Sequence, residues 1–436
     1  MVSKAALEAH KKAQENTLSK SGVSSNTAAT AVDQILPEDT LQQLSARAKE
    51  SVENQFGNSP NFEFACKRLQ LFPKFDFGEL QLGNVLGKGQ FGVVSEVKGV
   101  TFSSSSILCP KDSVGERESE EVDEDRNFIR QHCIRDGEAR YAIKILNQEH
   151  FREEEAYYIG VHDLAVEAHF LAAIEHPNIL KLRGLSSEPL GGRTFFLLLD
   201  RLYGTLKERL VDWRLQIHKM SRGLSGISKS GKEKKKEFMK LRMRAAVDLS
   251  SAVMYLHQNH IMDRDLKPEN VGFDIRGDIK LFDFGLSREF EPDKGKPYKM
   301  TGMTGSLLYM APENYFEKPY DESIDIFSLG IIFWELISLD RLYPNFNSNI
   351  LKDMVMKRGV RPAVNSKWSQ GLQNLLRNMW SSTANERPTA RQVNILIKHE
   401  LAQMGSEEEK ADNRQMMRRR STFVQRRFVS KRNLNV

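Results

Sequence analysis

The chain has 436 residues, of which 40% are hydrophobic, and it carries a formal net charge of +6. This is enough apolar sequence for one large two-lobed domain or two domains. Its three cysteines, Cys66, Cys109 and Cys133, do not have the spacing of metal ligands and suggest a reducing compartment. The first twenty residues contain no apolar run, so we expect no signal peptide. The longest apolar stretch, at 329–338, is too short to cross a bilayer.

The positive charge is concentrated at the end of the sequence. Residues 411–436 contain seven Arg and one Lys against one Asp, so they carry +7 and the remainder carries about −1. A nearly neutral body indicates no obligatory nucleic-acid partner. The basic segment leaves a second hypothesis open, in which the protein binds nucleic acid or an anionic membrane surface through its tail.

The N-terminal part of the chain has a polar composition. Residues 1–74 predict a largely disordered extension, with one short helix that Asp39 or Thr40 could cap. Residues 79–87 and 91–99 predict two strands joined by a glycine-rich turn.

Two inserts interrupt the patterned sequence that follows. The first, near 100–138, is acid-rich and has no strong period, which predicts a loop. The second, near 219–237, is rich in Lys, Gly and Ser and interrupts a helical region. Strands dominate the sequence before the second insert and helical periods dominate over 241–401, which predicts an α+β arrangement of two lobes.

The sequence GKGQFGVV at 87–94 suggests a phosphate-binding turn. A second strand follows it, where a dinucleotide fold would have a helix, so we predict a strand–turn–strand flap. Gly87, Gly89 and Gly92 would let backbone N–H groups approach phosphate oxygens without a clash at Cβ. An ordinary hairpin turn is the alternative.

Several charged residues follow apolar segments. Lys144 lies inside an apolar strand and needs a partner, which Glu167 in the next helix could supply, unless Lys144 is simply an edge-strand lysine. Asp283 follows an apolar strand, and Asn270 lies five residues after Asp265. Carboxylate and amide oxygens are ligands that Mg²⁺ accepts, although a plain turn is the alternative at Asp283.

Together and in this order, these motifs resemble those of a eukaryotic-type protein kinase. The resemblance includes DRDLKPEN at 263–270, LFDFG at 281–285, YMAPE at 309–313 and DIFSLG at 325–330. It implies a two-lobed protein kinase fold over 75–404, between the extension and a basic tail at 405–436. Lys267 and the Trp-Glu pair in SLGIIFWEL imply a serine/threonine kinase with tyrosine-kinase-like or mitogen-activated kinase-kinase-kinase-like features.

The resemblance also implies roles for individual residues. Asp265 would accept the proton of the substrate hydroxyl, Lys267 would steady the phosphoryl charge, and Lys144 would pair with Glu167. Asn270 and Asp283 would bind Mg²⁺. The expected ATP-binding residues are Gly87, Lys88, Gly89, Gln90, Phe91, Gly92, Val94, Ala142, Lys144, Leu199, Asp200 and Leu202. The activation segment would contain Thr301, Thr304 and Ser306, and the expected structural residues are Arg264, Glu313, Asp325 and Arg387.

Two residues depart from the family pattern. Asp263 stands where the family has His or Tyr, and a buried carboxyl there would become protonated or accept local backbone N–H bonds. Gly272 replaces a Leu-like residue beneath adenine, which predicts weaker ATP binding unless a neighbour fills the gap. The residues that handle phosphate and metal are all present, so we predict an active enzyme. A pseudokinase scaffold that binds nucleotide without efficient transfer is the alternative.

The resemblance also predicts partners and a location. The partners would be a protein substrate with a Ser or Thr acceptor and an upstream kinase acting on the segment 286–308. The protein would be cytoplasmic, or nuclear through its basic tail. The tail is expected to be a solvated basic segment or a nuclear-localisation patch. Because Ser421 follows three arginines, the alternative is a docking or autoinhibitory segment that phosphorylation would release from the acid-rich insert at 116–125.

Overall fold

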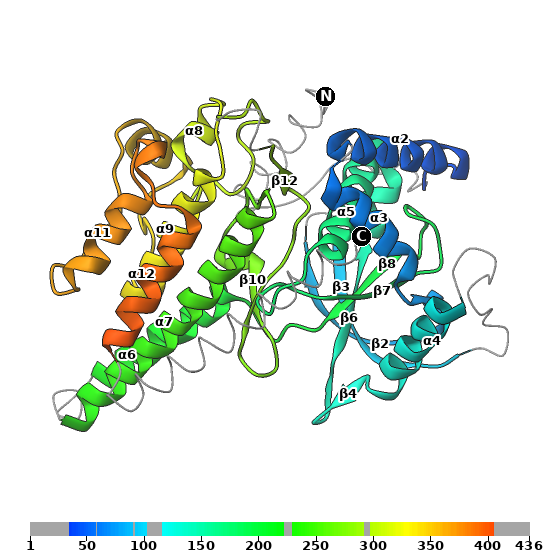
Figure 1. Ribbon diagram of the computed structural model, residues 1–436, viewed down its shortest axis with the longest axis horizontal. Coiled ribbons are helices and arrows are strands. Elements are labelled where there is room, and N and C mark those ends of the chain that lie inside the picture. The colour runs from blue at the N-terminus through cyan, green and yellow to red at the C-terminus, as the bar shows by residue number, and fades with distance from the viewer. Residues whose placement is uncertain are drawn as a thin grey trace, which may run out of the picture. The chain divides into compact units, whose positions relative to one another are not determined.

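The structure is a computed structural model that describes residues 35–57, 59–89, 92–102, 116–221, 229–291 and 297–404 (Figure 1). The chain divides into two compact units. The first comprises Met1–Ala173 and Lys181–Arg201, and the second comprises Ile174–Leu180 and Leu202–Val436. The first unit holds the main sheet and the second is mostly helical, as the α+β prediction requires.

The first unit is built on a six-stranded sheet with the order β1-β7-β8-β6-β3-β2. Its strands are β1 Lys74–Phe75, β2 Leu80–Lys88, β3 Gly92–Val100, β6 Tyr141–Leu146, β7 Leu182–Ser186 and β8 Phe196–Asp200. The central strand β6 pairs antiparallel with both β3 and β8. Tyr141 and Ile143 enter an apolar cluster, so Ala142 and Lys144 point to the other face of the sheet.

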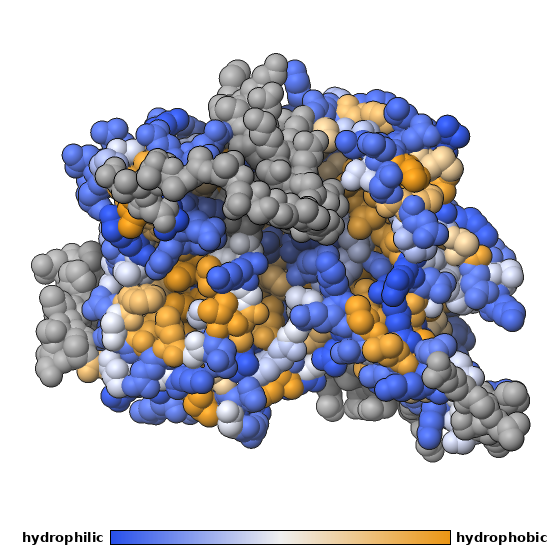
Figure 2. Space-filling model, turned by 180° about the vertical axis from the view of Figure 1, so that it is seen from behind, coloured by the Kyte–Doolittle hydropathy of each residue, from blue (hydrophilic) through white to orange (hydrophobic). Residues whose placement is uncertain are grey.

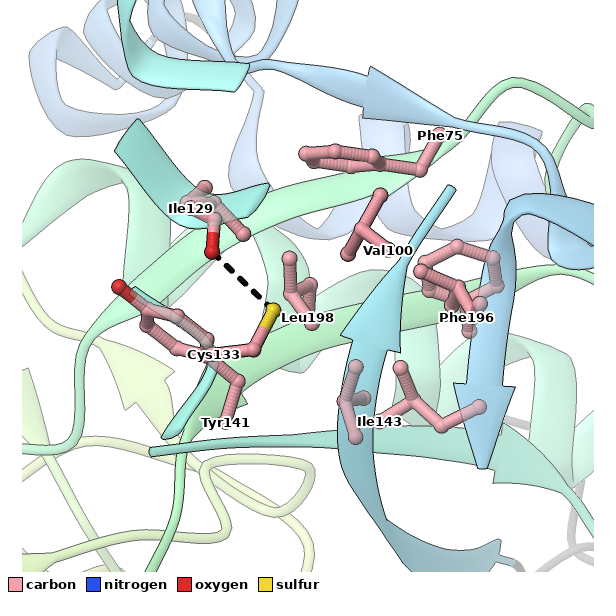
Figure 3. Close-up of a cluster of buried hydrophobic side chains, with 10 residues drawn as sticks. Phe75, Val100, Ile129, Cys133, Tyr141, Ile143, Phe196 and Leu198 are labelled. Atoms are coloured by element: carbon pink, nitrogen blue, oxygen red, sulfur yellow. Dashed lines mark hydrogen bonds between the residues drawn. The ribbon is translucent and has the colours of Figure 1, made fainter. Parts of the chain in front are cut away.

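From residue 116 onward the first insert is not the predicted loop, and residues 103–115 lie outside the described residues. It forms helix α4 at Glu116–Gln131, followed by the short strands β4 Ile134–Arg135 and β5 Glu138–Ala139. Figure 3 shows Ile129 and Cys133 in the apolar cluster with Phe75, Val100 and Phe196.

Arginine side chains explain why the sequence pattern of α4 predicted a loop. The Arg126 guanidinium lies 4.7 Å from the Phe102 ring centroid and 5.2 Å from that of Phe75. Arg126 also binds the buried Glu79 carboxylate at 3.0 and 3.1 Å, in the turn η1 Phe77–Glu79. Arg126 therefore occupies an inward position that a hydropathy pattern counts as polar.

The N-terminal extension is helical where the structure describes it, so the predicted short helix is confirmed and the prediction of disorder is wrong for the residues that follow it. The predicted helix is α2 at Glu38–Phe56, and Pro37 rather than Asp39 or Thr40 occupies the N-cap position. A second helix, α3 Pro60–Leu71, is capped by the Ser59 hydroxyl. Both helices pack on α5 Glu154–Ala173, which follows the turn η2 Gln148–Arg152. Residues 1–34 lie outside the described residues.

The second unit is organised around helix α9, Ser323–Ser338, whose residues from Ile324 to Ile337 are all buried. The other long helices are α6 Leu206–Ser221, α7 Lys229–Gln258, α11 Gln370–Met379 and α12 Ala390–Gln403. The shorter elements are η4 Pro268–Asn270, α8 Pro312–Tyr315, α10 Ser348–Ile350, η6 Leu351–Lys357 and η7 Ala384–Glu386. The second insert becomes helical again at Lys229, and residues 222–228 lie outside the described part of the chain.

Two small ladders in the second unit hold the segments that carry the motifs. Strand β10 Val271–Phe273 pairs with β11 Ile279–Leu281, and β9 Ile261–Met262 pairs with β12 Arg288–Glu289. In the part of the chain that the structure describes, no helix is both long and apolar enough to cross a membrane. Figure 2 shows a mainly hydrophilic surface on which apolar side chains gather in separate patches.

The burial of α4 leads to a test of its contribution to stability. Ile129 is 4% exposed in the apolar cluster, whereas Ile134, five residues later, is 47% exposed. We expect Ile129→Ala to lower the free energy of unfolding by about 2–5 kcal/mol through lost burial and the remaining cavity. Ile134→Ala, the matched control, should change it by less than about 1 kcal/mol. Urea denaturation measures both, and equal losses would show that α4 does not belong to the core.

Candidate active site

The structure places Lys144 and Glu167 in contact within the first unit. The Nζ atom of Lys144, on β6, lies 2.5 Å from an Oε atom of Glu167, on α5, and Glu167 is 2% exposed. Gly92 leaves room for the lysine, because a Cβ at position 92 would lie 3.2 Å from Lys144 Cε. The predicted ion pair is therefore present, and the buried Glu167 carboxylate fixes the direction of the half-buried Lys144 ammonium group.

The glycine-rich turn joins β2 to β3 as predicted. The backbone N–H of Gly89 donates to the carbonyl of Gly92 at 2.8 Å, which closes the turn. A Cβ on Gly87 would meet nothing within 4 Å, and a Cβ on Gly89 would lie 3.6 Å from its nearest neighbour. Packing inside the protein therefore does not explain these two glycines, which fits a turn that a ligand approaches. Gln90 and Phe91 lie outside the described residues.

The remaining expected ATP-binding residues lie on the same sheet or just after it. Ala142 and Leu199 are paired in register on β6 and β8, and both are buried. Val94 is paired with Lys144 and half-buried, and Lys88 at the end of β2 is exposed. Arg183 binds the Asp200 carboxylate at 2.7 and 2.9 Å, so this side chain already has a cationic partner within the first unit.

The second unit surrounds Asp265 with hydrogen-bond donors. Its Oδ2 atom accepts a bond from Lys267 Nζ at 2.5 Å, and its Oδ1 atom accepts one from the Ser306 hydroxyl at 3.0 Å. The Asn270 amide nitrogen donates to the Asp265 carbonyl at 3.1 Å and to Oδ2 at 3.2 Å. Asp265 is 6% exposed. These bonds hold one carboxylate in a single orientation.

The charges around Asp265 have opposing effects. Burial raises the pKa of Asp265, the Lys267 ammonium lowers it, and the nearby Asp283 carboxylate raises it further, so the net shift is upward. Burial opposes the charge of Lys267, but Asp265, Asp283 and Glu269 outweigh it and raise the Lys267 pKa. Lys267 therefore remains cationic while Asp265 becomes a stronger base than an ordinary aspartate.

Asn270 and Asp283 lie at the same end of the β10–β11 hairpin. Val271 is paired with Leu281, and the Phe282 N–H donates to the Asn270 carbonyl at 3.0 Å. Since the amide nitrogen of Asn270 is bonded to Asp265, its amide oxygen is the atom left to bind a cation. One amide oxygen and one carboxylate suit Mg²⁺, which keeps several waters. The described residues contain no cluster of three or more His, Cys, Asp or Glu side chains suited to a metal.

Buried hydrogen bonds hold the backbone just before Asp265, and a separate ion pair joins Glu313 to Arg387. Asp325, on α9, accepts the backbone N–H groups of Asp263 and Arg264 at 2.9 Å each. His257 Nε2 lies 2.9 Å from the same carboxylate, a contact that no sequence motif indicated. Arg387 binds Glu313 through two contacts, of 2.5 and 3.0 Å, as the resemblance implied.

Comparison with known proteins identifies the family. The protein kinase domain matches residues 128–399, which is more than half of the chain. This chain belongs to the protein kinase family. The predicted two-lobed α+β kinase fold is thereby confirmed.

The curated relatives are kinases of modest identity. The serine/threonine-protein kinase STY46 of Arabidopsis thaliana is 32% identical over 166 residues, covering 38% of this chain and 28% of that protein. A probable serine/threonine-protein kinase of Dictyostelium discoideum is 25% identical over 326 residues, covering 74% and 28%. The dual specificity protein kinase shkB of the same organism is 27% identical over 315 residues, covering 67% and 44%. The chain thus spans less than half the length of each of these relatives.

Thr301 and Thr304, the two threonines expected in an activation segment, have different environments. Arg264 Nη1 donates to the Thr301 hydroxyl and to the Tyr320 hydroxyl, at 3.1 Å each. Thr304 is 6% exposed, and its hydroxyl donates to the Thr301 carbonyl at 3.1 Å. The backbone of Thr304 is held by Asn314, whose amide donates to the Thr304 carbonyl at 2.7 Å. Thr301 therefore lies beside a cation, whereas Thr304 is part of the interior.

A neighbouring side chain fills the space left by Gly272. A Cβ at position 272 would lie 2.6 Å from the Leu202 Cδ1 atom and 3.2 Å from its Cγ atom. The expected gap is therefore occupied by Leu202, in agreement with the exception that the sequence left open. The prediction of weaker ATP binding loses its physical basis.

Asp263 satisfies both alternatives stated from the sequence, one at each oxygen. Its Oδ1 atom accepts the Asp265 N–H at 3.1 Å, while its Oδ2 atom is buried without a hydrogen-bond partner among the described residues. Burial, followed by the charges of Asp325 and Asp265, raises the pKa of Asp263 well above its ordinary value. The folded kinase therefore favours the neutral form of this carboxyl group more than the unfolded chain does.

The raised pKa of Asp263 predicts that the free energy of unfolding falls as the pH rises. A group whose pKa is higher in the folded state favours folding at low pH, and that contribution is lost as pH rises toward its folded-state pKa. Above the unfolded pKa of about 4, the loss is at most about 1.4 kcal/mol per pH unit. Asp263→Asn is neutral at every pH, so its stability relative to the wild type should increase from pH 5 to pH 8.

The measurement is the free energy of unfolding by urea at pH 5, 6, 7 and 8. Asp212→Asn, on the exposed face of α6, is the matched control and should show no such trend. A difference between wild type and Asp263→Asn that stays constant with pH would contradict a neutral Asp263.

Proposed function

We propose that this kinase is a protein serine/threonine kinase of intracellular signalling, which transfers the ATP γ-phosphoryl group to a Ser or Thr hydroxyl of a protein substrate. The observation that carries the proposal is the group of donors around Asp265. The Asp265 carboxylate, whose pKa is raised, accepts hydrogen bonds from Lys267 and Ser306. The Asn270 amide donates a further bond to it. Such an arrangement suits a base that must accept one proton in one direction.

In the proposed reaction, Asp265 accepts the hydroxyl proton as the hydroxyl oxygen bonds to the γ-phosphorus and the bond to the β–γ bridging oxygen breaks. Lys267 stabilises the negative charge that moves with the phosphoryl group. Bound Mg–ATP supplies the phosphoryl group and neutralises charge on the phosphates. Asn270 and Asp283 would hold the cation, and the ammonium of Lys144, oriented by Glu167, would contact the α- and β-phosphates.

Two observations support serine/threonine specificity. Lys267 lies two residues after Asp265 and is bonded to it, as the serine/threonine resemblance implied. Relatives in two organisms carry the name serine/threonine-protein kinase, and another is named a dual specificity kinase. The domain would span 75–404 and act on a protein partner in the cytoplasm, or in the nucleus through residues 405–436, which lie outside the described residues.

The alternative of a pseudokinase rested on Asp263 and Gly272. Both departures have a local compensation, because Asp263 accepts the Asp265 N–H and Leu202 fills the space beside Gly272. Neither residue is itself one of the carboxylate, amide and ammonium groups assigned to phosphate and metal. These observations favour an active enzyme.

Removing the base tests the proposed function. Asp265→Asn should lower kcat by about 10²–10⁴-fold, the usual contribution of general-base catalysis, while the affinity for ATP is kept. Asp212→Asn, an equally conservative change on the surface of α6, should leave kcat unchanged. Phosphate transfer to a peptide library and ATP titration measure the two effects. Transfer that survives Asp265→Asn, or that is absent from the wild type, contradicts the proposal.

The contacts of Arg264 predict which threonine is phosphorylated. A phosphate on Thr301 would add about −1.5 to −2 charges beside the guanidinium. We expect mass spectrometry of the active enzyme to find phosphate on Thr301 and none on buried Thr304. Thr301→Ala should then lower kcat/KM by about 10- to 100-fold, the worth of one charge-assisted hydrogen bond. Phosphate on Thr304 alone would show that the segment is activated differently.

A further inference from the structure

Helix α5 presents apolar side chains in almost every direction. Thirteen of its 20 residues are buried, including Tyr157, Val161, Ala165 and Phe170. One side lies close to the sheet, because a Cβ on Gly160 would come within 2.4 Å of the Leu146 Cδ1 atom on β6. A helix with apolar side chains on all sides must be buried by a second structural element in addition to the sheet.

The N-terminal helix α2 supplies part of that cover. Its buried residues, Leu41, Leu44, Ala48, Val52 and Phe56, recur every three or four positions and so form one face. The first three join Leu146, Phe151, Tyr157 and Val161 in a single apolar cluster. Leu146 lies two residues after Lys144 on the same strand. The α2 helix therefore contacts both the strand that carries Lys144 and the helix that carries Glu167.

Hydrogen bonds hold both ends of α5. Near its start, the Tyr157 hydroxyl lies 2.8 Å from the Ser45 hydroxyl of α2 and donates to the Gly191 carbonyl at 2.5 Å. Near its end, Arg68 of α3 donates to the Ala172 carbonyl at 2.8 Å. Carbonyls of a last helical turn lack helical partners and favour a cation.

Aromatic rings complete the contact beside Glu167. The Phe62 ring stacks on His169 with centroids 4.9 Å apart, and the Phe56 ring meets that of Phe170 edge-on at 5.1 Å. His169 and Phe170 are two and three residues from Glu167. The N-terminal helices thus reach the part of α5 from which the glutamate projects.

We infer that α2 and α3 are an intramolecular brace that positions Glu167 against Lys144, which makes residues 35–72 part of the phosphotransfer machinery. This inference rests on the proposed function. If the brace is displaced, α5 exposes an apolar face and is free to shift or rotate, which breaks the 2.5 Å ion pair. Ala48 is the central positioning residue, because it is 0% exposed where α2 meets α5.

A matched pair of substitutions in the full chain tests the brace. Ala48→Glu places a charge in the buried contact, while Ala46→Glu makes the same change on the exposed face of α2. We expect Ala48→Glu to lower kcat/KM by about 5–150-fold, the usual range for coupling between sites. Ala46→Glu should stay within about twofold of the wild type. Equal values for the two variants would overturn the inference.

A double-mutant cycle with Glu167→Gln separates positioning from general instability. If α2 acts through Glu167, Ala48→Glu should cost little in the Glu167→Gln background, whereas full additivity of the two losses would overturn the brace. Where Ala48→Glu does not fold, Tyr157→Phe replaces it in the cycle, because it removes one hydroxyl and keeps the buried ring.

Two readouts do not require phosphate transfer. Release of α5 should speed hydrogen exchange over 154–173 and speed the acylation of Lys144 by an amine-reactive reagent, mapped by mass spectrometry. Both rates should rise in Ala48→Glu and not in Ala46→Glu, and unchanged rates would overturn the brace. An inactive wild type would contradict the proposed function alone, since these two rates still decide whether α2 holds the ion pair.

Discussion

The buried carboxylate of Asp325 is the constraint on which the second unit depends. It accepts two consecutive backbone N–H groups, those of Asp263 and Arg264, which a buried loop could not leave unpaired. Arg264 has a φ of +69°, a left-handed conformation that persists only where surrounding bonds impose it. With the backbone held, the Arg264 side chain reaches Thr301, and Asp265 meets Lys267 and Ser306.

Four carboxyl groups lie in and around this loop, and their mutual repulsion opposes the ionisation of all four. Asp263, Asp265, Asp283 and Asp325 lie close enough that three of them raise the pKa of Asp263. Each has a different environment: Asp325 receives backbone donors, Asp265 faces an ammonium, one oxygen of Asp263 lacks a hydrogen-bond partner among the described residues, and Asp283 is half-buried at the hairpin end. Asp263 is the group whose pKa burial and the neighbouring carboxylates raise, and a carboxyl that favours its neutral form can occupy a position where the family has a ring.

The sequence predicted the chemical groups well, because catalysis requires particular atoms at particular spacings. Lys144 with Glu167, Asp265 with Asn270, and Arg387 with Glu313 were all placed from motifs, and the structure brings each pair into contact. The compensations were not predictable. Nothing in the sequence indicates that Leu202 lies over Gly272 or that His257 lies against Asp325, since both contacts depend on tertiary packing between distant segments.

Helix α4, and the packing of α2 on α5, were missed for a physical reason. A helix that packs on an apolar surface needs apolar side chains on one face only, and the rest of its surface is free to be polar. Helix α4 satisfies this with Val122, Ile129 and the stacked Arg126, so its composition suggests a loop. Helix α2 does so with five apolar residues among 19, within an arm whose composition suggests disorder.

The folded first unit therefore extends beyond the segment that carries its motifs. One face of its sheet is covered by α4 and the outer side of α5 is covered by α2 and α3. Either surface, left bare, would expose the large apolar side chains that drive folding. The sequence of α5 indicates the need for α2 more clearly than the sequence of α2 does. A 20-residue helix with apolar residues in almost every direction must be packed against other elements on more than one side. The limits of this domain are set by where its apolar surfaces are covered, and for α5 that lies N-terminal to the first catalytic motif.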